Sequence, residues 1–388
     1  LTACSNSSQD TSQTIAINPT QSPVHSVSEM AHTIEYVPLS LPIIGEIGSR
    51  IIHSQNLFFV PTNYPACIHI FDEAGNSASN ICQQGEGPGK YKSISDFIVA
   101  PSGDALYILS RNSFKIMKYD LDGNFIEDYK IPVYASKFEI WDDERFVLYC
   151  GNEKTEYNAT KIVFYNYQTG ETEEGPFPIN AKESRYLNFF DRNNFLKTED
   201  DELYFFYGFN DTIYRLDHQE AVPHRVINFG KHTIPPEFYA QEFQDVMDFM
   251  SRVRNPANDF AARIIGYYET DTHIHFIFEF RQKFLMVFYD KNSETYTLSS
   301  EMEDDMVLEG FSVYEGVEDG PRGVTEDGQF IFMKEAGYIR AHLDSLKQTL
   351  SVKAWNTISE RHAIIKSLDE RLDINSNPVL ILVEPRPF

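Results

Sequence analysis

Residues 105–125 read "ALYILSRNSFKIMKYDLDGNF", and this stretch carries the pattern that decides the fold. Two runs rich in aliphatic and aromatic residues flank a short polar segment, and the second run ends in an Asp-Gly turn, as in two paired strands. This pattern of two runs and a turn is repeated along the chain. We mark each copy by the residue just before its turn: Phe71, Tyr119, Tyr165, Tyr214, Tyr289 and Ala341. The steps between these positions are 48, 46, 49, 75 and 52 residues, so four of the five lie near 50.

Each copy also contains further strands. A strand-like run precedes every copy of the turn pattern, from "LFFV" (57–60) to "QFIFMK" (329–334). The second copy also contains an earlier strand-like run at "SDFIVAPSG" (95–103). About four short strands in a period near 50 residues are typical of the blades of a β-propeller. A β-sandwich or a barrel needs no such repeat. The sequence therefore predicts an all-β fold, a six-bladed β-propeller.

The long step between Tyr214 and Tyr289 contains a helical pattern at 233–256. Pro235 and Pro236 favour a helix start, and apolar residues then recur at steps of three and four. This predicts a helical insertion between blades 4 and 5. The insertion either caps a face of the propeller or packs on its side, and an apolar helix face more often packs on its own domain than on a partner.

A helix and a strand are expected at the C-terminal end. Thr357 and Glu360 have the spacing of a capping box, and the apolar residues that follow predict a helix over 357–372. The run "NPVLILVEP" (377–385) then predicts a closing strand. We expect this strand to lie beside "EYVPLSLP" (35–42), so that the two ends of the chain close the ring.

The glycine-rich segment "CQQGEGPGKYKSISDF" (82–97) raises the question of a phosphate cradle. Gly85, Gly87 and Gly89 fit neither the dinucleotide fingerprint nor a P-loop, because no Lys-Ser/Thr pair follows. The segment lies between the last strand of one repeat and the first strand of the next. We interpret it as a blade-to-blade turn that uses the backbone freedom of glycine.

This segment and the strands after it also carry a family resemblance. "QQGEGPGKYKSISDF" followed by "ALYILSRNSFKIMKYDLDGNFIEDYKIP" resembles the NHL-like six-bladed β-propeller lipoproteins of gut-type Gram-negative bacteria. The resemblance extends from about Ile44 to "NPVLIL" (377–382), and Lys90 stands where the family often has an acid. It implies the fold, lipidation and a cell-envelope location. It supplies no catalytic motif.

The segment before the repeats is predicted to be a membrane tether. "LTAC" (1–4) resembles the end of a bacterial lipobox, so Cys4 is the expected lipid attachment site. The following "SNSSQDTSQT" is polar and has no apolar surface to offset the entropy cost of ordering. We expect residues 1–33 to be a lipobox remnant and flexible tether, and 34–388 to be the propeller domain. Acyl chains would then hold the protein at the envelope, as an outer-membrane lipoprotein, without a helix that crosses the membrane.

The charge balance excludes two classes of partner. The 33 Lys and Arg against 58 Asp and Glu give a net charge of −25. No cluster of basic residues is available for phosphate contacts, which argues against binding to nucleic acid. The same balance argues against docking on anionic lipid through charge alone.

Three cysteines follow Cys4. Cys67, Cys82 and Cys150 show no CxxC or Cys/His spacing, so no metal site is predicted from them. A disulfide between Cys67 and Cys82 is one alternative in an oxidising compartment. Buried free thiols are the interpretation that we favour.

Candidate ligand-binding residues come from the loops between the second and third strands of each repeat, and one comes from the predicted channel. Propellers bind ligands at such loops, and these side chains offer hydrogen bonds and stacking suited to sugars or peptides. The alternative is that loops are polar in any protein. The candidates are Tyr64, Asp96, Arg111, Asn112, Asn210, Asp211, Arg281, Gln282 and Tyr338.

Two further patterns suggest metals but favour simpler interpretations. His273 and His275 share one face of a strand, yet no third ligand is visible, so we expect histidines on a strand surface. The acidic runs 199–202 and 301–305 lack the calcium-loop pattern and are expected to be solvated turns. No cofactor and no metal are predicted.

Three functions remain open at the level of sequence. The leading hypothesis is a lipid-anchored binding or scaffold module for a glycan, a peptide or a partner protein. The alternative is a metal-dependent hydrolase or lyase with its site in the central channel, where Asp96 is the first residue to inspect; it rests on fold-level analogy, and no GxSxG or HExxH motif supports it. The third is a subunit of a larger complex that docks through an exposed apolar patch on 238–253.

Overall fold

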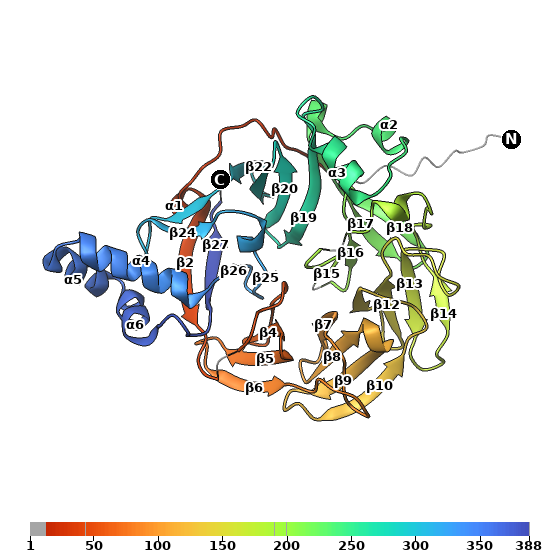
Figure 1. The fold of residues 1–388 in the computed structure, drawn as a ribbon, viewed down its shortest axis with the longest axis horizontal. Coiled ribbons are helices and arrows are strands. Elements are labelled where there is room, and N and C mark those ends of the chain that lie inside the picture. The colour runs from red at the N-terminus through yellow and green to blue at the C-terminus, as the bar shows by residue number, and fades with distance from the viewer. Residues whose placement is uncertain (1–12, 43, 190, 199, 388) are drawn as a thin grey trace.

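The computed structural model describes residues 13–42, 44–189, 191–198 and 200–387 of the chain. Most of its strands lie in six sheets of four or five strands, and one further sheet has two. Figure 1 shows the sheets side by side around a ring, in the order of the chain. The expected lipid attachment site, Cys4, lies outside the described residues.

The six larger sheets are antiparallel, apart from one parallel pair that β1 makes at the edge of the fourth. In chain order they are β3–β6 (Ile52–Ser54, Leu57–Asn63, Ala66–Asp72, Ser77–Ile81), β7–β10 (Asp96–Val99, Ala105–Ser110, Lys115–Asp120, Phe125–Lys130), β11–β14 (Lys137–Ile140, Arg145–Tyr149, Ile162–Asn166, Thr172–Glu174), β15–β18 (Phe195–Lys197, Leu203–Phe205, Thr212–Asp217, Glu220–Asn228) with β1 (Gln13–Ala16), β19–β22 (Ala261–Glu269, His273–Phe280, Lys283–Asp290, Thr295–Ser299), and β25–β26–β27–β2 (Gly323–Val324, Phe330–Lys334, Val379–Pro385, Ala31–Pro38). The two-stranded sheet is β23 (Met302–Asp304) with β24 (Phe311–Tyr314).

The first strand of each sheet faces the interior of the ring. Strand β3 contacts both β25 and β7, and β11 contacts both β7 and β15, so these strands neighbour one another across the sheet boundaries. Figure 1 shows β19 on the same inner side. Successive antiparallel sheets whose first strands surround a common axis make this a propeller-like fold.

Apolar side chains fill the space between neighbouring sheets. Phe59 and Ile68 of the first sheet belong to one buried cluster with Phe97 and Leu106 of the second. In β20 all eight residues are buried, because both faces of its sheet are covered. The ring is therefore held together mainly by apolar contacts between successive sheets.

The repeat pattern is confirmed for five of its six copies. The anchor residues fall in the third strand of a sheet, which is β5, β9, β13, β17 or β21 in turn: Phe71, Tyr119, Tyr165, Tyr214 and Tyr289. The runs predicted upstream of them fall in the second strands. Alternating strand pattern is a local property, which is why it could be read from the sequence.

The sixth copy was predicted wrongly. Ala341 lies in a helix, α4 (Ala336–Thr349), and not in a strand. Ile339 and Leu343 are four residues apart and both are buried against the core, which is helical spacing. The last sheet takes its third strand from β27 and its outer strand from β2 instead.

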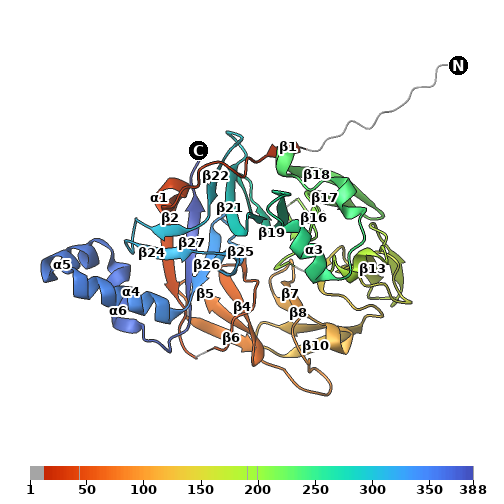
Figure 2. The same cartoon turned by 45° about the horizontal axis from the view of Figure 1, so that its top comes forward.

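The predicted C-terminal helix is two helices, α5 (Val352–Arg361) and α6 (Ala363–Arg371). Thr357 was expected to cap the helix, but Ser351 caps α5 by accepting the Ala354 N–H at 3.2 Å. Thr357 lies inside α5 and donates its hydroxyl to the carbonyl of Lys353 at 2.9 Å. Figures 1 and 2 show α4, α5 and α6 together at one side of the ring.

Closure of the ring by the two ends of the chain is confirmed. Strand β2 pairs antiparallel with β27, and Ile34 faces Val383 while Tyr36 faces Ile381. All four side chains are buried. The closing sheet thus joins residues that are almost the whole chain apart.

The tether predicted over 1–33 is corrected from Gln13 onward. Strand β1 pairs in parallel with β18, and Ile15 lies opposite Ile227. The short helix α1 (Val27–Met30) buries both of its end residues in the core. The segment was judged too polar to order, but its few apolar residues are spaced so that each reaches a buried position.

Two short helices lie within the predicted helical span, α2 (Pro236–Tyr239) and α3 (Val246–Val253). The break between them is set by Asp245, whose carboxylate accepts the N–H groups of Met247 and Asp248 at 2.9 Å each. The apolar side chains of both helices pack on the domain itself, against Tyr186 and Phe209. The exposed docking patch expected on 238–253 is therefore mostly buried, and Met247 is its main exposed residue.

Two of the cysteines are joined. Cys67 and Cys82 form a disulfide, with Cα atoms 4.4 Å apart, so our preference for free thiols was wrong. The pairing depends on β5 and β6 being neighbouring strands, which the sequence spacing alone does not reveal. Cys150 is free and buried, and burial raises the pKa of its thiol to about 12.

The glycine-rich segment joins β6, the outer strand of the first sheet, to β7, the inner strand of the second. Gly89 has φ +63°, and a Cβ at this position would lie 2.9 Å from Cγ of Phe125, so glycine is required there. The buried Tyr91 hydroxyl lies 2.9 Å from the carbonyl oxygens of Ala66 and Ile81. The segment therefore ties two successive sheets together.

Candidate functional site

The inner strands bring charged residues together at one end of the ring. Each inner strand follows a connection from the outer edge of the preceding sheet, and because the sheets repeat one strand order, the inner strands all begin at the same end. One charged side chain lies at or near the start of each: Arg50, Asp96, Lys137, Arg192, Arg263 and Arg322. Five of the six are basic, in a chain whose net charge is −25.

A cavity of about 490 Å³ opens at this end, which we call the axial cavity. Four basic side chains line it, with two acidic ones, three serine hydroxyls and two apolar side chains. They are Arg111, Lys137, Arg192, Arg263, Asp191, Glu318, Ser49, Ser95, Ser136, Ile265 and Val317. The volume lies within the usual range for small-ligand pockets, and the lining is unusually polar for one.

Asp96 is buried and neutralised by two cations. Its Oδ1 lies 3.4 Å from Nη1 of Arg50 and 3.4 Å from Nζ of Lys137. Its Oδ2 accepts the backbone N–H of Phe138 at 3.2 Å. This carboxylate, the first one to inspect for a metal in the channel, is therefore committed to linking the first three sheets.

Arg192 holds the connection that leads into the last sheet. Its Nη2 donates to the carbonyls of Val317 at 2.7 Å and Glu318 at 3.0 Å. Its Nη1 donates to Gly320 and, at 2.9 Å, to Pro321. Both Nη atoms are thus bonded to backbone oxygens, and the guanidinium acts as a structural brace beside the axial cavity.

Three polar atoms at the axial cavity have no hydrogen-bond partner among the described residues. They are Oγ of Ser136, Oδ2 of Asp191 and Nε of Arg263. The Ser136 side chain is buried, with 5% of the residue exposed, as is Asp191. A buried polar atom without a partner costs about 1–3 kcal/mol, so such atoms gathered at one cavity indicate places where a ligand or water binds.

Burial shifts the protonation of these groups. Burial raises the pKa of Asp191 to about 7, although the positive charges of Arg263, Lys137 and Arg192 oppose the shift. Burial also lowers the pKa of Lys137, and burial together with the nearby Arg192 lowers the pKa of Arg322 to about 10. The charge of the axial cavity therefore becomes more positive when Asp191 takes up a proton near neutral pH.

Of the predicted loop residues, Arg111 is the one that reaches the axial cavity. It begins the short helix η1 (Arg111–Ser113), and its guanidinium lies 3.9 Å from the centre of the Tyr134 ring. The next residue, Asn112, donates to Oγ of Ser93 at 3.3 Å and accepts from the Tyr134 hydroxyl at 3.4 Å. Arg111 belongs to the lining, whereas Asn112 contacts the surrounding loops.

The other candidates lie elsewhere. Asn210 and Asp211 line a separate pocket beside α2, and Arg281 and Gln282 line another beside α3. Arg281 is held there by Asp259, with N–O distances of 2.6 and 2.9 Å. The exposed Tyr64 and Tyr338 belong to no described pocket: Tyr64 lies in the turn between β4 and β5, and Tyr338 on α4. Among the described residues, the predicted loop candidates that line a pocket are thus divided between the axial cavity and the two pockets beside α2 and α3.

Most of the axial cavity was missed by sequence reasoning. Arg111 is the one candidate in its lining, and the other charged and hydroxyl groups come mostly from residues at or just before the inner strands: Ser49, Ser95, Ser136, Lys137, Asp191, Arg192, Arg263 and Glu318. The available signal was a polar or charged residue directly before each predicted first strand, as in "SDFIVA". It was overlooked because only one such strand was identified clearly.

The two histidines of β20 are not on a surface. His273 and His275 are buried, which corrects the expectation of surface residues. Nε2 of His273 lies 3.1 Å from the carbonyl oxygen of Arg386. His275 packs on the rings of Phe288 and Phe330, and burial lowers its pKa to about 3, so it is neutral in the folded protein.

Two other patterns also have structural roles. Within 301–305, Asp304 is buried: it accepts the Tyr36 hydroxyl at 2.6 Å and the N–H of Leu308 at 2.6 Å, so this run is not a fully solvated turn. Among the described residues, the one group of at least three metal-ligating side chains is Cys67, His69 and Cys82, and the disulfide occupies two of its three ligand atoms.

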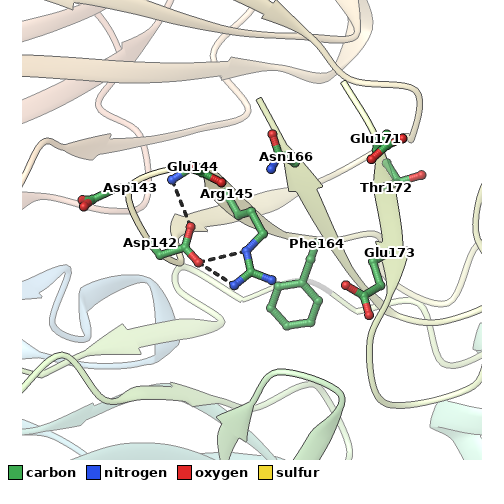
Figure 3. Close-up of a pocket in the computed structure, with 9 residues that line it drawn as sticks. All are labelled: Asp142, Asp143, Glu144, Arg145, Phe164, Asn166, Glu171, Thr172 and Glu173. Carbon is green, nitrogen blue, oxygen red and sulfur yellow. Dashed lines mark hydrogen bonds and ion pairs between the residues drawn. The ribbon is translucent and has the colours of Figure 1, made fainter. Parts of the chain in front are cut away.

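An acidic pocket of about 550 Å³ is lined by residues of the third sheet and its turns. Figure 3 shows these residues. Asp142, Glu144, Glu171 and Glu173 contribute to its lining. Its one basic residue, Arg145, pairs with Asp142 at 2.6 and 2.9 Å. Carboxylates at the ends of surface hairpins are usually solvated, and this pocket carries no assignment.

Within the described residues, no helix is long and apolar enough to cross a membrane. A family model described as a domain of unknown function, DUF4934, matches residues 13–384. No curated protein matches the chain.

Two solved structures are similar over most of the chain. One is a putative exported protein from Bacteroides fragilis, 15% identical, with a TM-score of 0.74 over 97% of this chain and 100% of that one. The other is a member of the DUF4221 family from Bacteroides vulgatus, 10% identical, with a TM-score of 0.50 over 92% of this chain and 97% of that one. At these identities the similarity supports the fold alone.

Proposed function

The chain belongs to the family described as a domain of unknown function, DUF4934, and on this premise we propose that it is a binding module of the cell envelope. It would hold a glycan, a peptide or a partner protein at the axial cavity of a six-bladed β-propeller. The six blades correspond to the six sheets of four or five strands, and α2 and α3 form the insertion between the fourth and the fifth.

The axial cavity is the observation that carries this proposal. It is concave, it is built from residues of all six sheets or their connections, and it holds buried polar atoms that the described residues leave unpaired. A scaffold without a ligand would gain stability by filling such a site with apolar side chains. Retention of the polar groups favours a binding role.

An envelope location has independent support. The Cys67–Cys82 disulfide is typical of oxidising compartments outside the cytoplasm. The similar structure from Bacteroides fragilis is described as a putative exported protein. With the lipobox-like "LTAC", these observations favour export and attachment to the outer membrane through a lipid on Cys4.

The alternative, a metal-dependent hydrolase or lyase, is less favoured by the chemistry of the cavity. A calcium or similar ion needs several oxygen ligands with negative charge. Four of the six charged side chains that line the axial cavity are basic, and Asp96 is paired with Arg50 and Lys137. The donor set fits a hydrogen-bonding ligand better than a divalent cation.

The proposal is tested by a binding screen with a blocked variant. The full chain is screened against glycans and peptides by thermal shift, and each hit is repeated with Ser49→Trp, which places an indole at the exposed rim of the axial cavity. Ser345→Trp, at an exposed position on α4, is the matched control. Binding that is lost in Ser49→Trp and kept in Ser345→Trp supports the proposal. Hits that bind both variants equally, or no hit at all, contradict it.

The same screen addresses the metal alternative. The melting temperature is measured with calcium and with a chelator, because an ion that binds only the folded state at about 100 times its Kd adds roughly 2.7 kcal/mol of stability. A rise with calcium that Ser49→Trp abolishes would favour the alternative over the binding module. Equal melting temperatures in both conditions would leave the binding module favoured.

A further inference from the structure

The axial cavity has the opposite charge balance from the rest of the protein. Its lining includes four basic and two acidic side chains, while the whole chain has 33 basic and 58 acidic residues. Basic residues thus outnumber acidic ones in this lining, the reverse of the balance in the whole chain. Cations gathered in a concave site raise the local potential and attract anions.

The basic side chains differ in how far they are already used. The two Nη atoms of Arg192 already bond to four backbone carbonyls. Lys137 donates to the carbonyl of Arg192 at 2.8 Å and lies 3.4 Å from Asp96. Nε of Arg263 has no hydrogen-bond partner among the described residues, and its guanidinium lies 5.0 Å from the centre of the Phe189 ring. The carboxyl group of Asp191 is near enough for its charge to interact with Arg263. Arg263 is therefore the lining cation to which we assign the ligand contact, and protonation of Asp191 leaves its charge uncompensated.

Arg263 is also held in an unusual backbone conformation. It is the third residue of β19 and has φ +58°, in the left-handed region that costs a non-glycine residue energy. The pairing of β19 with β20 shifts register after Ala262, at this position. A bulge of this kind re-aims a side chain, and here that side chain lines the axial cavity.

A buried hydroxyl completes the donor set. Ser136 directly precedes Lys137 at the start of β11, and its Oγ is unpaired among the described residues although the residue is 5% exposed. Ser49 and Ser95 add two more hydroxyls to the lining. A guanidinium and a hydroxyl are the groups that commonly bind the oxygens of a carboxylate or a sulfate.

We propose, resting on the function proposed above, that the axial cavity binds an acidic sugar, one that carries a carboxylate or a sulfate group. Arg263 and the Ser136 hydroxyl hold the anionic group, and the hydroxyls of Ser49 and Ser95 bond to the hydroxyls of the ring. A sugar fits better than a peptide, because a peptide needs apolar pockets for its anchor side chains. The lining offers only Ile265 and Val317 as apolar groups.

The test is calorimetric titration of the full chain with four probes of similar size. These are digalacturonate, a sulfated galactose disaccharide, neutral galactobiose and a diglutamate peptide. We expect one of the acidic disaccharides to bind at least roughly 10-fold more tightly than galactobiose, since a hydrogen bond to a charged group is stronger than one to a neutral group. The two acidic disaccharides distinguish a carboxylate from a sulfate ester. Binding should weaken as ionic strength rises.

Variants connect the result to the residues. Arg263→Gln keeps a side chain of similar shape and should weaken binding of the acidic disaccharide roughly 10- to 100-fold. Arg361→Gln removes the same charge from an exposed position on α5 and should leave binding unchanged. Ser136→Ala removes a hydroxyl with no protein partner, so it should fold normally and still weaken binding.

The outcomes separate this inference from the proposed function. Equal binding of galactobiose and the acidic disaccharides, lost in Ser49→Trp, would overturn the preference for an anion while the binding function stands. Binding of diglutamate alone would overturn the sugar. Acidic-disaccharide binding that Arg263→Gln and Ser136→Ala leave unchanged would overturn the assignment of these residues. Failure of every probe and of the wider screen would overturn both proposals.

Discussion

Replacing Asp191 by asparagine should stabilise the protein at alkaline pH. Asp191 is buried among Arg263, Lys137 and Arg192, yet burial raises its pKa from 3.8 to about 7, so the cost of desolvation outweighs the attraction of the three cations. Asparagine resembles the protonated acid and carries no charge to desolvate. The substitution therefore removes a penalty that exists only while the carboxylate is ionised.

The sign and size follow from proton linkage. Between pH 3.8 and about 7 the folded protein holds the Asp191 proton more tightly than the unfolded chain, so this residue lowers stability as pH rises through that window. The pKa difference of 3.2 corresponds to about 4 kcal/mol, because one pH unit is worth about 1.4 kcal/mol. We expect Asp191→Asn to be more stable than the native chain by up to this amount above about pH 8, and nearly equal to it near pH 4.

Urea unfolding at several pH values measures the effect. The midpoint should rise in Asp191→Asn at alkaline pH while the slope with denaturant stays the same. Asp143→Asn, at an exposed position, is the matched control and should show no pH-dependent gain. If Asp191→Asn is no more stable than the native chain above pH 8, the three cations fully compensate the buried carboxylate. The argument from burial would then be wrong.

Three further predictions concern stability. Replacing Cys67 and Cys82 together by serine should lower the free energy of unfolding by about 3 kcal/mol, because the disulfide closes a loop of 15 residues. Urea unfolding measures this change, and an unchanged midpoint would contradict the prediction. His275 has a pKa of about 3 in the folded protein, so the unfolded chain binds more protons between pH 3 and 6.5, and stability falls as pH drops through that window. His275→Phe should therefore show a smaller fall in melting temperature over this pH range. A fall equal to that of the native chain would refute the prediction. Tyr91→Phe removes the hydroxyl that meets two backbone carbonyls and should cost about 1–3 kcal/mol by chemical denaturation, whereas Tyr157→Phe, at an exposed position, should cost little.

The sequence predicted the strands well where pairing is local. In the first five repeats the second and third strands form hairpins or near neighbours, so Phe71 and Tyr289 were correctly placed by their pattern alone. In the last repeat the partner strands come from opposite ends of the chain, and the local pattern around Ala341 misled us. Helical spacing of Ile339 and Leu343 was present there but was outweighed by the expectation of a sixth copy.

The candidate site was harder to predict because it depends on which strands are innermost. Asp96 was found since its strand was read clearly, whereas Arg263 lies in a register shift that no local pattern reveals. Arg192 and Ser136 precede strands in segments that read as ordinary polar loops. The absence of hydrogen-bond partners at Oγ of Ser136 and Nε of Arg263, among the residues that the structure describes, is a property of the closed ring and not of any single segment.

The closing pair of strands also sets the order in which the molecule can be completed during synthesis. Ile34 in β2 is made early and its partner Val383 is made 349 residues later. At roughly 5–20 residues per second, the ribosome needs about 20–70 s to supply the partner strand. During that interval the apolar side chains of β2 have nowhere to be buried, so nascent chains are exposed to aggregation. A chain truncated near residue 378 would remain permanently in this open state.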